Sequence, residues 1–288
     1  MANTLPFSRA AIIGTGLIGG SFALALRKHF PAISIVGFDR PEALHKALAR
    51  GAIQESANDI AGALRGADLV YVALPIGATI DALPAIAAHA GASAFVTDAG
   101  STKTVICRVA KEHFQNGTRF LGGHPMAGRE HSGVEYADAD LFRGASYALI
   151  GNGDDPDARV KAFESVVRAI GARSEWVDAE THDWAVGIVS HLPQLLAIAL
   201  ARTVQDETDE TGLPLSLAGP GLQDVLRLAG SPYGMWRDIV HTNTENISRA
   251  LDRLGQAVEH LRTRLTNKDL ESEFAAANEI YKTLHKPR

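Results

Sequence analysis

The chain has a single cysteine, Cys107, among its 288 residues. One thiol excludes an intrachain disulfide framework and any metal cluster built on several cysteines. The histidines show no metal-ligand spacing, so we expect no metal site. Basic residues are not in excess either, because 28 Lys and Arg stand against 33 Asp and Glu, for a net charge of −5. Without the basic face that nucleic acids require, we expect no nucleic-acid partner.

Long hydrophobic runs are also lacking. The most apolar stretch, residues 10–26, has 17 residues and is interrupted by four glycines, whereas a membrane helix needs about 20 apolar residues. The residues before Arg9 carry no charged side chain, which does not fit a signal peptide. We therefore expect no membrane partner and a cytoplasmic location. Hydrophobic residues make up 46% of the chain, enough for a large buried core.

The sequence changes character at about residue 178. Before this point, short apolar runs alternate with helix-like segments, which is typical of a parallel sheet wrapped by helices. We expect strands at 10–13, 33–38, 69–74, 94–97, 120–122, 147–150 and 174–177. After it, apolar residues recur at intervals of three and four, which predicts long helices. The expected fold is an α/β domain with a mostly parallel, doubly wound sheet over 1–177, followed by an all-α domain over 178–288.

A glycine-rich motif follows the first predicted strand. Residues 11–20 read AIIGTGLIGG, with G-x-G-x-x-G between a strand and the start of a helix. The glycines allow a tight turn and let backbone N–H groups at the helix N-terminus approach a pyrophosphate. The motif therefore predicts a dinucleotide site and makes residues 1–177 a Rossmann domain. The residues that we assign to this site are Gly14, Thr15, Gly16, Leu17, Ile18 and Gly19.

An acidic residue supports the dinucleotide site. Asp39 ends the next predicted strand, where a carboxylate accepts hydrogen bonds from a ribose diol. Its charge repels a 2′-phosphate, so NAD is favoured over NADP as the cofactor. Arg40 leaves this choice open, since an arginine there either accommodates the phosphate or is a solvated residue before a helix. Leu74 and Thr79 complete the cofactor set because they follow another strand at the same edge of the sheet.

Two further loops at this edge carry candidate catalytic residues. They read DAGSTK at 98–103 and GGHPMAGRE at 122–130. His124 in the second loop is a natural general base beside a hydride acceptor, because an imidazole has an ordinary pKa of about 6.5. The residues alone thus lead to a dehydrogenase that removes a hydroxyl proton. A histidine that only packs or caps a turn is the alternative.

Five segments of the chain resemble the prephenate dehydrogenase family, which includes arogenate and cyclohexadienyl dehydrogenases. They are GTGLIGGS at 14–21, DAGSTK at 98–103, GGHPMAGREHSG at 122–133, SHLPQ at 190–194 and LQDVLRLAGSPYGMWRDI at 222–239. They span nearly the whole chain, and the His-Pro-Met-Ala-Gly element is not a general Rossmann feature. The resemblance implies an NAD-dependent oxidoreductase of tyrosine biosynthesis that converts prephenate to 4-hydroxyphenylpyruvate by oxidative decarboxylation.

The resemblance also implies two catalytic residues. His124 would hydrogen-bond and deprotonate the ring hydroxyl while hydride leaves the same carbon for the nicotinamide. Ser101 would orient that hydroxyl or the imidazole. Loss of carbon dioxide then makes the ring aromatic, so the implied reaction is effectively one-way.

A carboxylate-bearing substrate needs a cationic partner, and Arg227 stands at the family's substrate-binding arginine. A guanidinium binds a carboxylate through two parallel hydrogen bonds. In the family, the residues at the positions of Glu130, Asp224 and Arg227 form an ionic gate at the mouth of the pocket. Without the resemblance, a surface ion pair with Asp224 three positions earlier is the favoured interpretation of Arg227, and the two interpretations are compatible.

One position departs from the prephenate-specific branch of the family. That branch has a second histidine where this chain has Gln194, near His191 on the same predicted helix. The position contacts the substrate side chain, and an amide serves an ammonium as well as a ketone. Arogenate or dual cyclohexadienyl specificity, giving tyrosine directly, is therefore the alternative activity. Without the resemblance, Gln194 is a polar residue on a helix surface and His191 a buried structural histidine.

Two more distant alternatives remain. A β-hydroxyacid dehydrogenase has a similar layout but needs a catalytic lysine in the helical half. Lys268 is the single lysine between Lys161 and Lys282, and it lacks the surrounding motif. A non-catalytic NAD-binding sensor would bind the cofactor without turnover.

The last part of the chain predicts a subunit interface. We expect one long helix at about 232–265, with an apolar stripe that is too extensive to face water. The stripe predicts a homodimer formed through the helical domain, which the resemblance also makes the substrate-binding domain.

Overall fold

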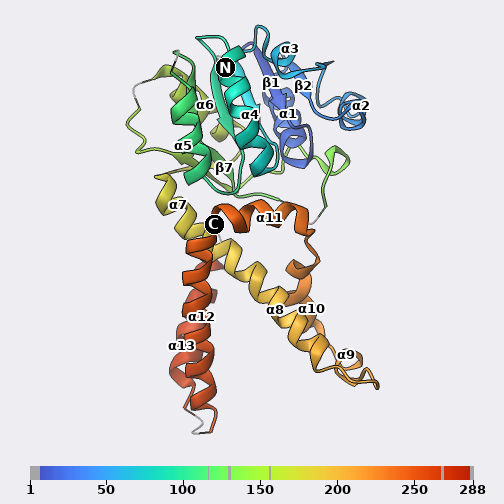
Figure 1. Ribbon diagram of the computed structural model, residues 1–288, viewed down its shortest axis with the longest axis vertical. Coiled ribbons are helices and arrows are strands. Elements are labelled where there is room, and N and C mark those ends of the chain that lie inside the picture. Colours follow the sequence, from blue (N-terminus) through green and yellow to red (C-terminus); the bar gives the residue numbers. More distant parts are fainter. Residues whose placement is uncertain (1–6, 116, 129–130, 156, 267–268, 286–288) are drawn as a thin grey trace.

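The computed structural model describes residues 7–115, 117–128, 131–155, 157–266 and 269–285. It contains a sheet region, up to residue 177, and a helical region, from residue 179 onward. In Figure 1 the helical region extends downward from the sheet region as two diverging arms.

The sheet region is built on six parallel strands in the order β3-β2-β1-β4-β5-β6. Their bounds are β1 Arg9–Ile13, β2 Ser34–Phe38, β3 Glu55–Ser56, β4 Leu69–Val72, β5 Phe95–Asp98 and β6 Arg119–Leu121. The strand order reverses between β1 and β4, and ligands bind beyond the carboxyl ends of such sheets at this switch point. The order confirms the predicted doubly wound α/β fold.

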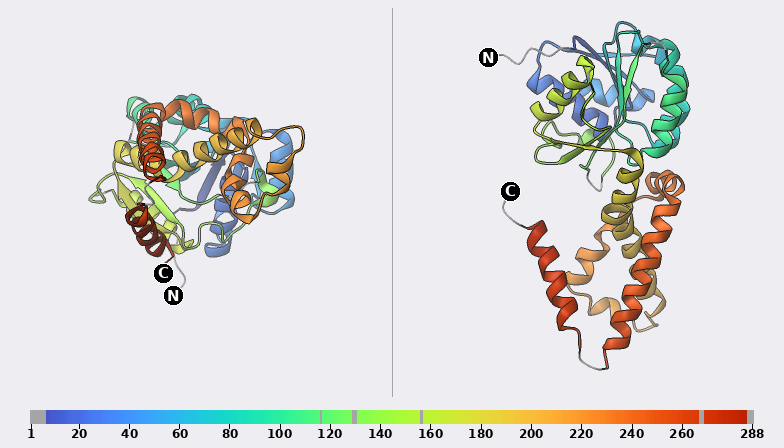
Figure 2. Two further views of the ribbon diagram at one scale, coloured as in Figure 1. Left: turned by 90° about the horizontal axis from the view of Figure 1, so that it is seen from below. Right: turned by 90° about the vertical axis from the view of Figure 1, so that its left-hand side faces the viewer.

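Helices cover both faces of this sheet (Figure 2). They are α1 Leu17–His29, α2 Pro41–Ala49, α3 Ile60–Leu64, α4 Ile76–His89, α5 Thr104–His113 and α6 Ala158–Ala169, with a short 3₁₀ turn, η1, at Val134–Tyr136. Neighbouring residues of one strand belong to opposite cores, because successive side chains point to opposite faces. On β1, Ile12 packs in the core that contains Phe22 of α1, whereas Ile13 packs in the core that contains Ala82 of α4.

Three later strands form a separate small sheet. They are β7 Gly123–Pro125, β8 Ser146–Ile150 and β9 Arg173–Val177, of which β7 and β8 are antiparallel and β8 and β9 parallel. The expected strands at 147–150 and 174–177 are present, but they do not extend the main sheet. The chain leaves that sheet at Gly123, where a Cβ atom would lie 2.8 Å from the carbonyl oxygen of Asp98. Glycine therefore permits the close crossing that starts the second sheet.

The helical region has no strand among its described residues. Its elements are α7 Ala179–Val186, a π-helical turn, η2, at Gly187–His191, α8 Leu192–Asp206, α9 Leu213–Ser216, α10 Pro220–Leu226, a 3₁₀ turn, η3, at Arg227–Gly230, α11 Tyr233–Thr242, α12 Thr244–Arg264 and α13 Glu271–Leu284. The π turn lies just before Pro193, which has no N–H to continue the regular hydrogen-bond pattern. Figure 1 shows α12 extending as one arm and α8 to α10 as the other, and the right-hand view of Figure 2 shows α13 diverging from α12.

The expected single helix at 232–265 is wrong, because the chain breaks between α11 and α12. The break is at Asn243, which is buried and has φ −126° and ψ 26°. Its side-chain Nδ2 donates to the backbone oxygen of Asp183, 2.7 Å away. The amide is thus used to bind α7, and the helix restarts in a new direction at Thr244.

Helices α7 and α8 run on as one apolar helix, residues 179–206. By length and composition alone this helix could cross a membrane, with a mean hydropathy of 1.6 over its most apolar window and 28% of that window buried. The sequence analysis singled out residues 10–26 instead, which the structure places in β1, the glycine loop and α1. Most of the exposed large hydrophobic residues of the described chain lie in the helical region.

Carboxylates of the helical region bind the first turns of two helices of the sheet region. Asp238 of α11 accepts a hydrogen bond from the backbone N–H of Gly77 in α4 at 2.9 Å. Asp183 of α7 accepts from the backbone N–H groups of Lys103 and Thr104 at the start of α5, at 2.7 and 2.9 Å. A helix N-terminus has unpaired N–H groups and a partial positive charge, so these contacts anchor the helical region at the carboxyl edge of the sheet.

Candidate active site

A cavity of about 740 Å³ opens beyond the carboxyl ends of β1, β2 and β4. It is lined by Gly14, Gly16 and Leu17 of the glycine loop, by Asp39 and Arg40 after β2, by Leu74 after β4, and by residues of the segments 42–46, 73–75 and 132–135. The cavity lies at the switch point of the sheet, where an α/β fold of this strand order binds its ligand.

The glycines of the loop have the three properties that a dinucleotide cradle needs. Gly14 has φ +94°, which favours glycine, and a Cβ atom there would lie 2.5 Å from the oxygen of Ala73. A Cβ on Gly19 would lie 1.9 Å from the oxygen of Gly14, so α1 packs too closely on β1 for any other residue. A Cβ atom on Gly16 would meet no atom within 4 Å, so this position has open space where a pyrophosphate would approach. The loop fits a dinucleotide.

Asp39 lies at the cavity and binds the glycine loop. Its Oδ2 accepts from the backbone N–H of Thr15 at 2.7 Å, and its Oδ1 accepts from the N–H of Arg40 at 2.7 Å. A carboxylate has about four acceptor positions, so it can still accept a ribose hydroxyl. Thr79 and Ile18 do not line the cavity. The buried Thr79 hydroxyl donates to the oxygen of Leu74 at 3.1 Å, and Ile18 packs against the core.

His124 lies on β7 and is hydrogen-bonded to a second histidine. Its Nδ1 is 2.9 Å from Nε2 of His182 on α7, and Nδ1 of His182 is 2.8 Å from Oδ1 of Asp183. His182 and Asp183 are buried, whereas His124 is partly exposed. The sequence analysis missed His182 and Asp183. Nothing in the sequence THDW at 181–184 marks them, because their contact with His124 joins residues 58 positions apart.

The surroundings of His124 keep its ring neutral. Burial lowers the pKa of His124 well below 6.5, and the nearby His182, Lys103 and His191 lower it further. The neutral ring has one unprotonated nitrogen at physiological pH, which is the form that a general base requires.

The segment 98–103 holds β7 in place through a buried ion pair. Lys103 and Asp98 are fully buried and pair with each other. Lys103 Nζ also donates to the oxygen of Gly123 at 2.7 Å, and Asp98 Oδ1 accepts from the Gly123 N–H at 3.2 Å. The pair therefore binds both backbone groups of the residue before His124. Ser101 is partly buried in the same segment, between β5 and α5.

The predicted substrate residues of the helical region are distributed over three elements. His191 ends the π turn and is buried, with its Nδ1 3.1 Å from Nδ2 of Asn243. Burial lowers the pKa of His191 to about 4, although Asp183 opposes this effect. Gln194 on α8 is 2% exposed, so the surface interpretation of this residue is wrong. Its Nε2 donates to the oxygen of Leu228 at 2.8 Å, which ties α8 to η3.

Arg227 is the first residue of η3, directly after α10. It is exposed at the surface, and so is Asp224 on α10. The third member of the expected gate, Glu130, lies outside the described residues, as does Lys268. The hydrogen bond from Gln194 reaches Leu228, the residue that follows Arg227 in η3.

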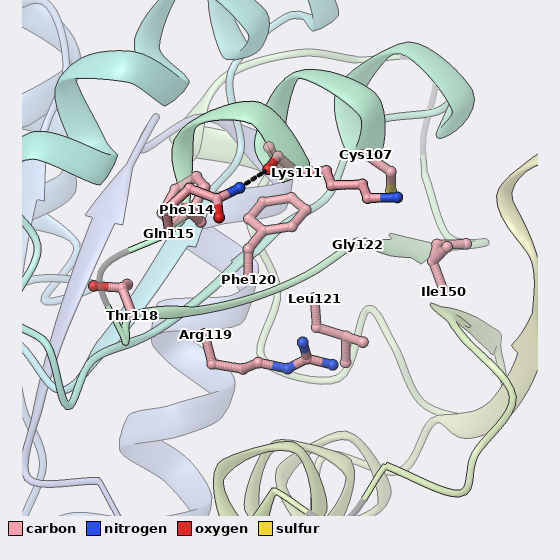
Figure 3. Close-up of a pocket in the computed structure, with 11 residues that line it drawn as sticks. Cys107, Lys111, Phe114, Gln115, Thr118, Arg119, Phe120, Leu121, Gly122 and Ile150 are labelled. Carbon is pink, nitrogen blue, oxygen red and sulfur yellow. Dashed lines mark hydrogen bonds between the residues drawn. The ribbon is translucent and has the colours of Figure 1, made fainter.

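A second cavity lies between α5 and β6 and has a volume of about 470 Å³ (Figure 3). Phe114 and Phe120 line it with their rings 5.3 Å apart, and Arg119 at its edge pairs with Asp155. Cys107 also lines it, and burial raises the pKa of this thiol to about 12 although Lys103 opposes that rise. The Cys107 thiol therefore stays protonated near neutral pH and offers no thiolate at this cavity.

Comparisons with known proteins agree with this geometry. The family model "Prephenate dehydrogenase, nucleotide-binding domain" matches residues 22–176, and "Prephenate dehydrogenase, dimerization domain" matches residues 178–279. The prephenate dehydrogenase of Lactococcus lactis is 34% identical over 91% of this chain and 72% of its own length. The cyclohexadienyl dehydrogenase of Zymomonas mobilis is 28% identical over 91% of this chain and 90% of its own length.

A solved structure extends the likeness over nearly the whole fold. Prephenate dehydrogenase from A. aeolicus, in complex with hydroxyphenyl propionate and NAD+, superposes with a TM-score of 0.89. It is 31% identical to this chain, and the match covers 98% of each chain. The sheet region is thus a nucleotide-binding domain for a nicotinamide cofactor, and the chain belongs to the prephenate dehydrogenase family.

Proposed function

We propose that this chain catalyses the NAD-dependent oxidative decarboxylation of prephenate to 4-hydroxyphenylpyruvate, a step of tyrosine biosynthesis. The observation that carries the proposal is the position of His124. It is a neutral histidine at the same edge of the sheet as the glycine loop, with its Nδ1 occupied by His182. The relatives named prephenate dehydrogenase support the choice of substrate.

The proposed reaction begins with proton removal at the ring hydroxyl. Bound NAD supplies the acceptor for the hydride that leaves the same carbon. His124 takes the hydroxyl proton through Nε2, because Nδ1 is engaged with His182. Ser101, in the loop before α5, orients the hydroxyl. The bond to the ring carboxylate then breaks, its electron pair makes the ring aromatic, and the proton on His124 returns to the phenolate oxygen.

Recognition of the substrate falls to the helical region in this proposal. Arg227 binds a substrate carboxylate, and Asp224 and Glu130 complete the ionic gate. His191 and Gln194 lie near the side chain of the substrate. Residues 1–177 then serve as the NAD-binding domain and 178–288 as the substrate-binding and dimerisation domain. Tight packing of Gln194 against η3 supports a role in shaping this part of the site.

Arogenate is the second candidate substrate, and Gln194 is the observation that favours it. Its Nε2 is used by Leu228 and its Oε1 lies 3.5 Å from the hydroxyl of Ser231. The carbonyl oxygen therefore has an acceptor position left for an ammonium group. A chain of this kind would act on both cyclohexadienols or on arogenate alone.

NAD is the proposed cofactor in preference to NADP. The Asp39 carboxylate lines the cofactor cavity, where it would accept the ribose hydroxyls and repel a 2′-phosphate. Arg40 lines the same cavity and provides the one opposing argument, since a guanidinium attracts a phosphate.

We also propose a homodimer formed through the helical region. The matched dimerization domain covers this region, and its helices expose apolar side chains that neither arm buries. They include Val189, Leu217, Val258, Leu265, Phe274 and Ile280, each more than half exposed. A second copy of the chain covers such a surface without exposing a new one.

The experiment that tests the proposed activity follows the absorbance of the reduced nicotinamide. Purified protein is mixed with prephenate or arogenate, each with NAD or NADP. We expect turnover with prephenate and NAD. Turnover with arogenate alone would transfer the proposal to the second substrate, and no turnover in any of the four mixtures would overturn it.

A further inference from the structure

Three side chains form a continuous hydrogen-bonded line that ends at His124. Asp183 Oδ1 is 2.8 Å from Nδ1 of His182, and Nε2 of His182 is 2.9 Å from Nδ1 of His124. The rings of the two histidines lie 5.1 Å apart with an interplanar angle of 70°. Asp183 and His182 are 2% and 3% exposed, so water does not compete for these bonds.

The protonation of Asp183 determines the direction of every bond in the line. Burial raises the pKa of Asp183, but hydrogen bonds from His182 and from the backbone at Thr104 outweigh burial and hold the pKa below its ordinary value. The ionised carboxylate only accepts, so His182 donates from Nδ1. The Nε2 atom of a neutral His182 then accepts, and His124 must donate to it from Nδ1. Nε2 of His124 is left without a proton.

We propose that His182 and Asp183 are positioning residues that hold His124 in the tautomer with its proton on Nδ1, so that Nε2 is free to take the substrate's hydroxyl proton. The inference rests on the proposed function, in which His124 is the base. The line also acts after proton transfer. The imidazolium form of His124 donates a stronger hydrogen bond to His182, and the carboxylate beyond it stabilises the new positive charge.

The charges around His124 explain why this support is needed. Among the described residues, the groups that face it are His182 and Asp183 of α7, Lys103 with its partner Asp98, and His191 of the π turn. Burial, Lys103 and the two histidines all disfavour a protonated His124. The hydrogen-bonded line connects His124, through His182, to the Asp183 carboxylate.

The line also depends on how the two regions dock. Asp183 accepts from the N–H groups of Lys103 and Thr104 at the start of α5, as well as from His182. Asn243 donates to the backbone oxygen of Asp183 from the break between α11 and α12. The carboxylate is therefore oriented by groups from both regions, and the tautomer of His124 is determined only when these regions are in contact.

The first test needs no variant. Nitrogen-15 NMR of the complete protein labelled at histidine distinguishes a protonated ring nitrogen from an unprotonated one. His124 is assigned by its loss in His124→Asn. We expect protonation at Nδ1 and none at Nε2 at pH 7.5, without substrate. A proton on Nε2 would overturn the proposal, and the result is independent of whether the protein turns over prephenate.

The second test compares two substitutions of one residue. His182→Phe keeps a ring but removes both bonds, whereas His182→Gln keeps an acceptor for His124. We expect His182→Phe to lower kcat about 10- to 100-fold with KM within about twofold, as loss of an orienting partner does. His182→Gln should recover most of this loss. His89→Gln, at an exposed histidine of α4, is the control.

The pH profile separates a positioning role from a structural one. The nearby His182 ring lowers the pKa of His124 on balance, so in His182→Phe this pKa rises and the acidic limb of kcat moves to higher pH. If kcat and its pH profile are unchanged in His182→Phe, the proposal is overturned. It is also overturned if His182→Phe and His182→Gln lose the same fraction of kcat while both melt at the wild-type temperature. If His182→Phe does not fold, Asp183→Asn takes its place, with a mixture of His124 tautomers as the expected result. Wild type that is silent with every substrate would instead refute the proposed function.

Discussion

The two regions of this chain differ in how they treat apolar side chains. In the sheet region, Leu48, Met126 and Tyr136 are the only large hydrophobic residues that are exposed in the described structure. The described helical region exposes many more, among them Trp184, Leu217, Tyr233, Val258, Leu265 and Phe274. Two of the three hydrophobic cores lie on the main sheet and the third lies between α4 and α5, and Ile239 and Trp236 are the described helical-region residues that join the third core.

This difference indicates two sources of stability. The sheet region buries most of its apolar residues between its own layers. The helical region has long helices with little interior, so much of its apolar surface needs a partner. The proposed active site lies between them, where polar contacts such as Asp238 with the N–H of Gly77 join the regions.

The largest expected effect concerns the base at this junction. His124→Asn should lower turnover by about two to four orders of magnitude, the usual scale for removal of a general base. The NAD affinity should stay near wild type, because His124 does not line the cofactor cavity. Steady-state assays and a cofactor titration measure the two effects. Full retained activity would show that His124 is not the base.

The next prediction tests the contrast in exposure directly. Leu261 of α12 and Leu48 of α2 are 41% and 39% exposed, yet the former lies on the proposed interface. Burying a leucine contributes about 1.5–3 kcal/mol, so Leu261→Asp should weaken the dimer about 100-fold or more. Leu48→Asp should leave the mass of the dimer in solution unchanged. Sedimentation at micromolar concentration measures both, and a monomeric wild type would contradict the proposed dimer.

Substrate binding by the helical region predicts a smaller effect. Arg227→Ala should raise the KM for the substrate about 10- to 100-fold with little change in kcat, as loss of a charged hydrogen bond does. Arg202→Ala is the matched control, because Arg202 is exposed on α8 and pairs with Asp206. An unchanged KM would return Arg227 to the surface ion pair that the sequence pattern alone favours.

The smallest effect is expected at the second cavity of the sheet region. The raised pKa of Cys107, about 12, keeps its thiol protonated at pH 8, so it should react slowly with iodoacetamide. Cys107→Ser should change kcat less than about twofold. Rapid alkylation with loss of activity, followed by mass spectrometry, would place chemistry at this cavity after all.

Local patterns sufficed for the cofactor site. The strand, the glycines, the helix start and Asp39 follow one another within a short stretch of chain, and each has a backbone reason visible in its residue type. His124 was predicted as the base in the same way, from a loop that follows a strand. The partners of His124 could not be predicted from local patterns. His182 is distant from His124 in the sequence and has no motif around it, and only the fold brings the two rings together.

The helix break at Asn243 illustrates the same limit. The spacing of apolar residues continues without interruption across residues 232–265 and predicts one helix. The break follows from a buried amide that binds Asp183, 60 positions earlier in the chain. The spacing of apolar residues cannot predict this contact, because the contact depends on which distant residues the fold brings together.

The sequence by itself determined the Rossmann sheet, the glycine cradle and the helical character of the last third, because backbone preferences and hydrophobic periodicity act over neighbouring residues. Tertiary structure alone decided the small sheet that carries His124, the buried pair of Asp98 and Lys103, and the line from Asp183 to His124. These features rest on side chains that are distant in sequence and on the burial that surrounds them. Burial is also what makes the ring of His124 neutral, and a linear sequence does not contain it.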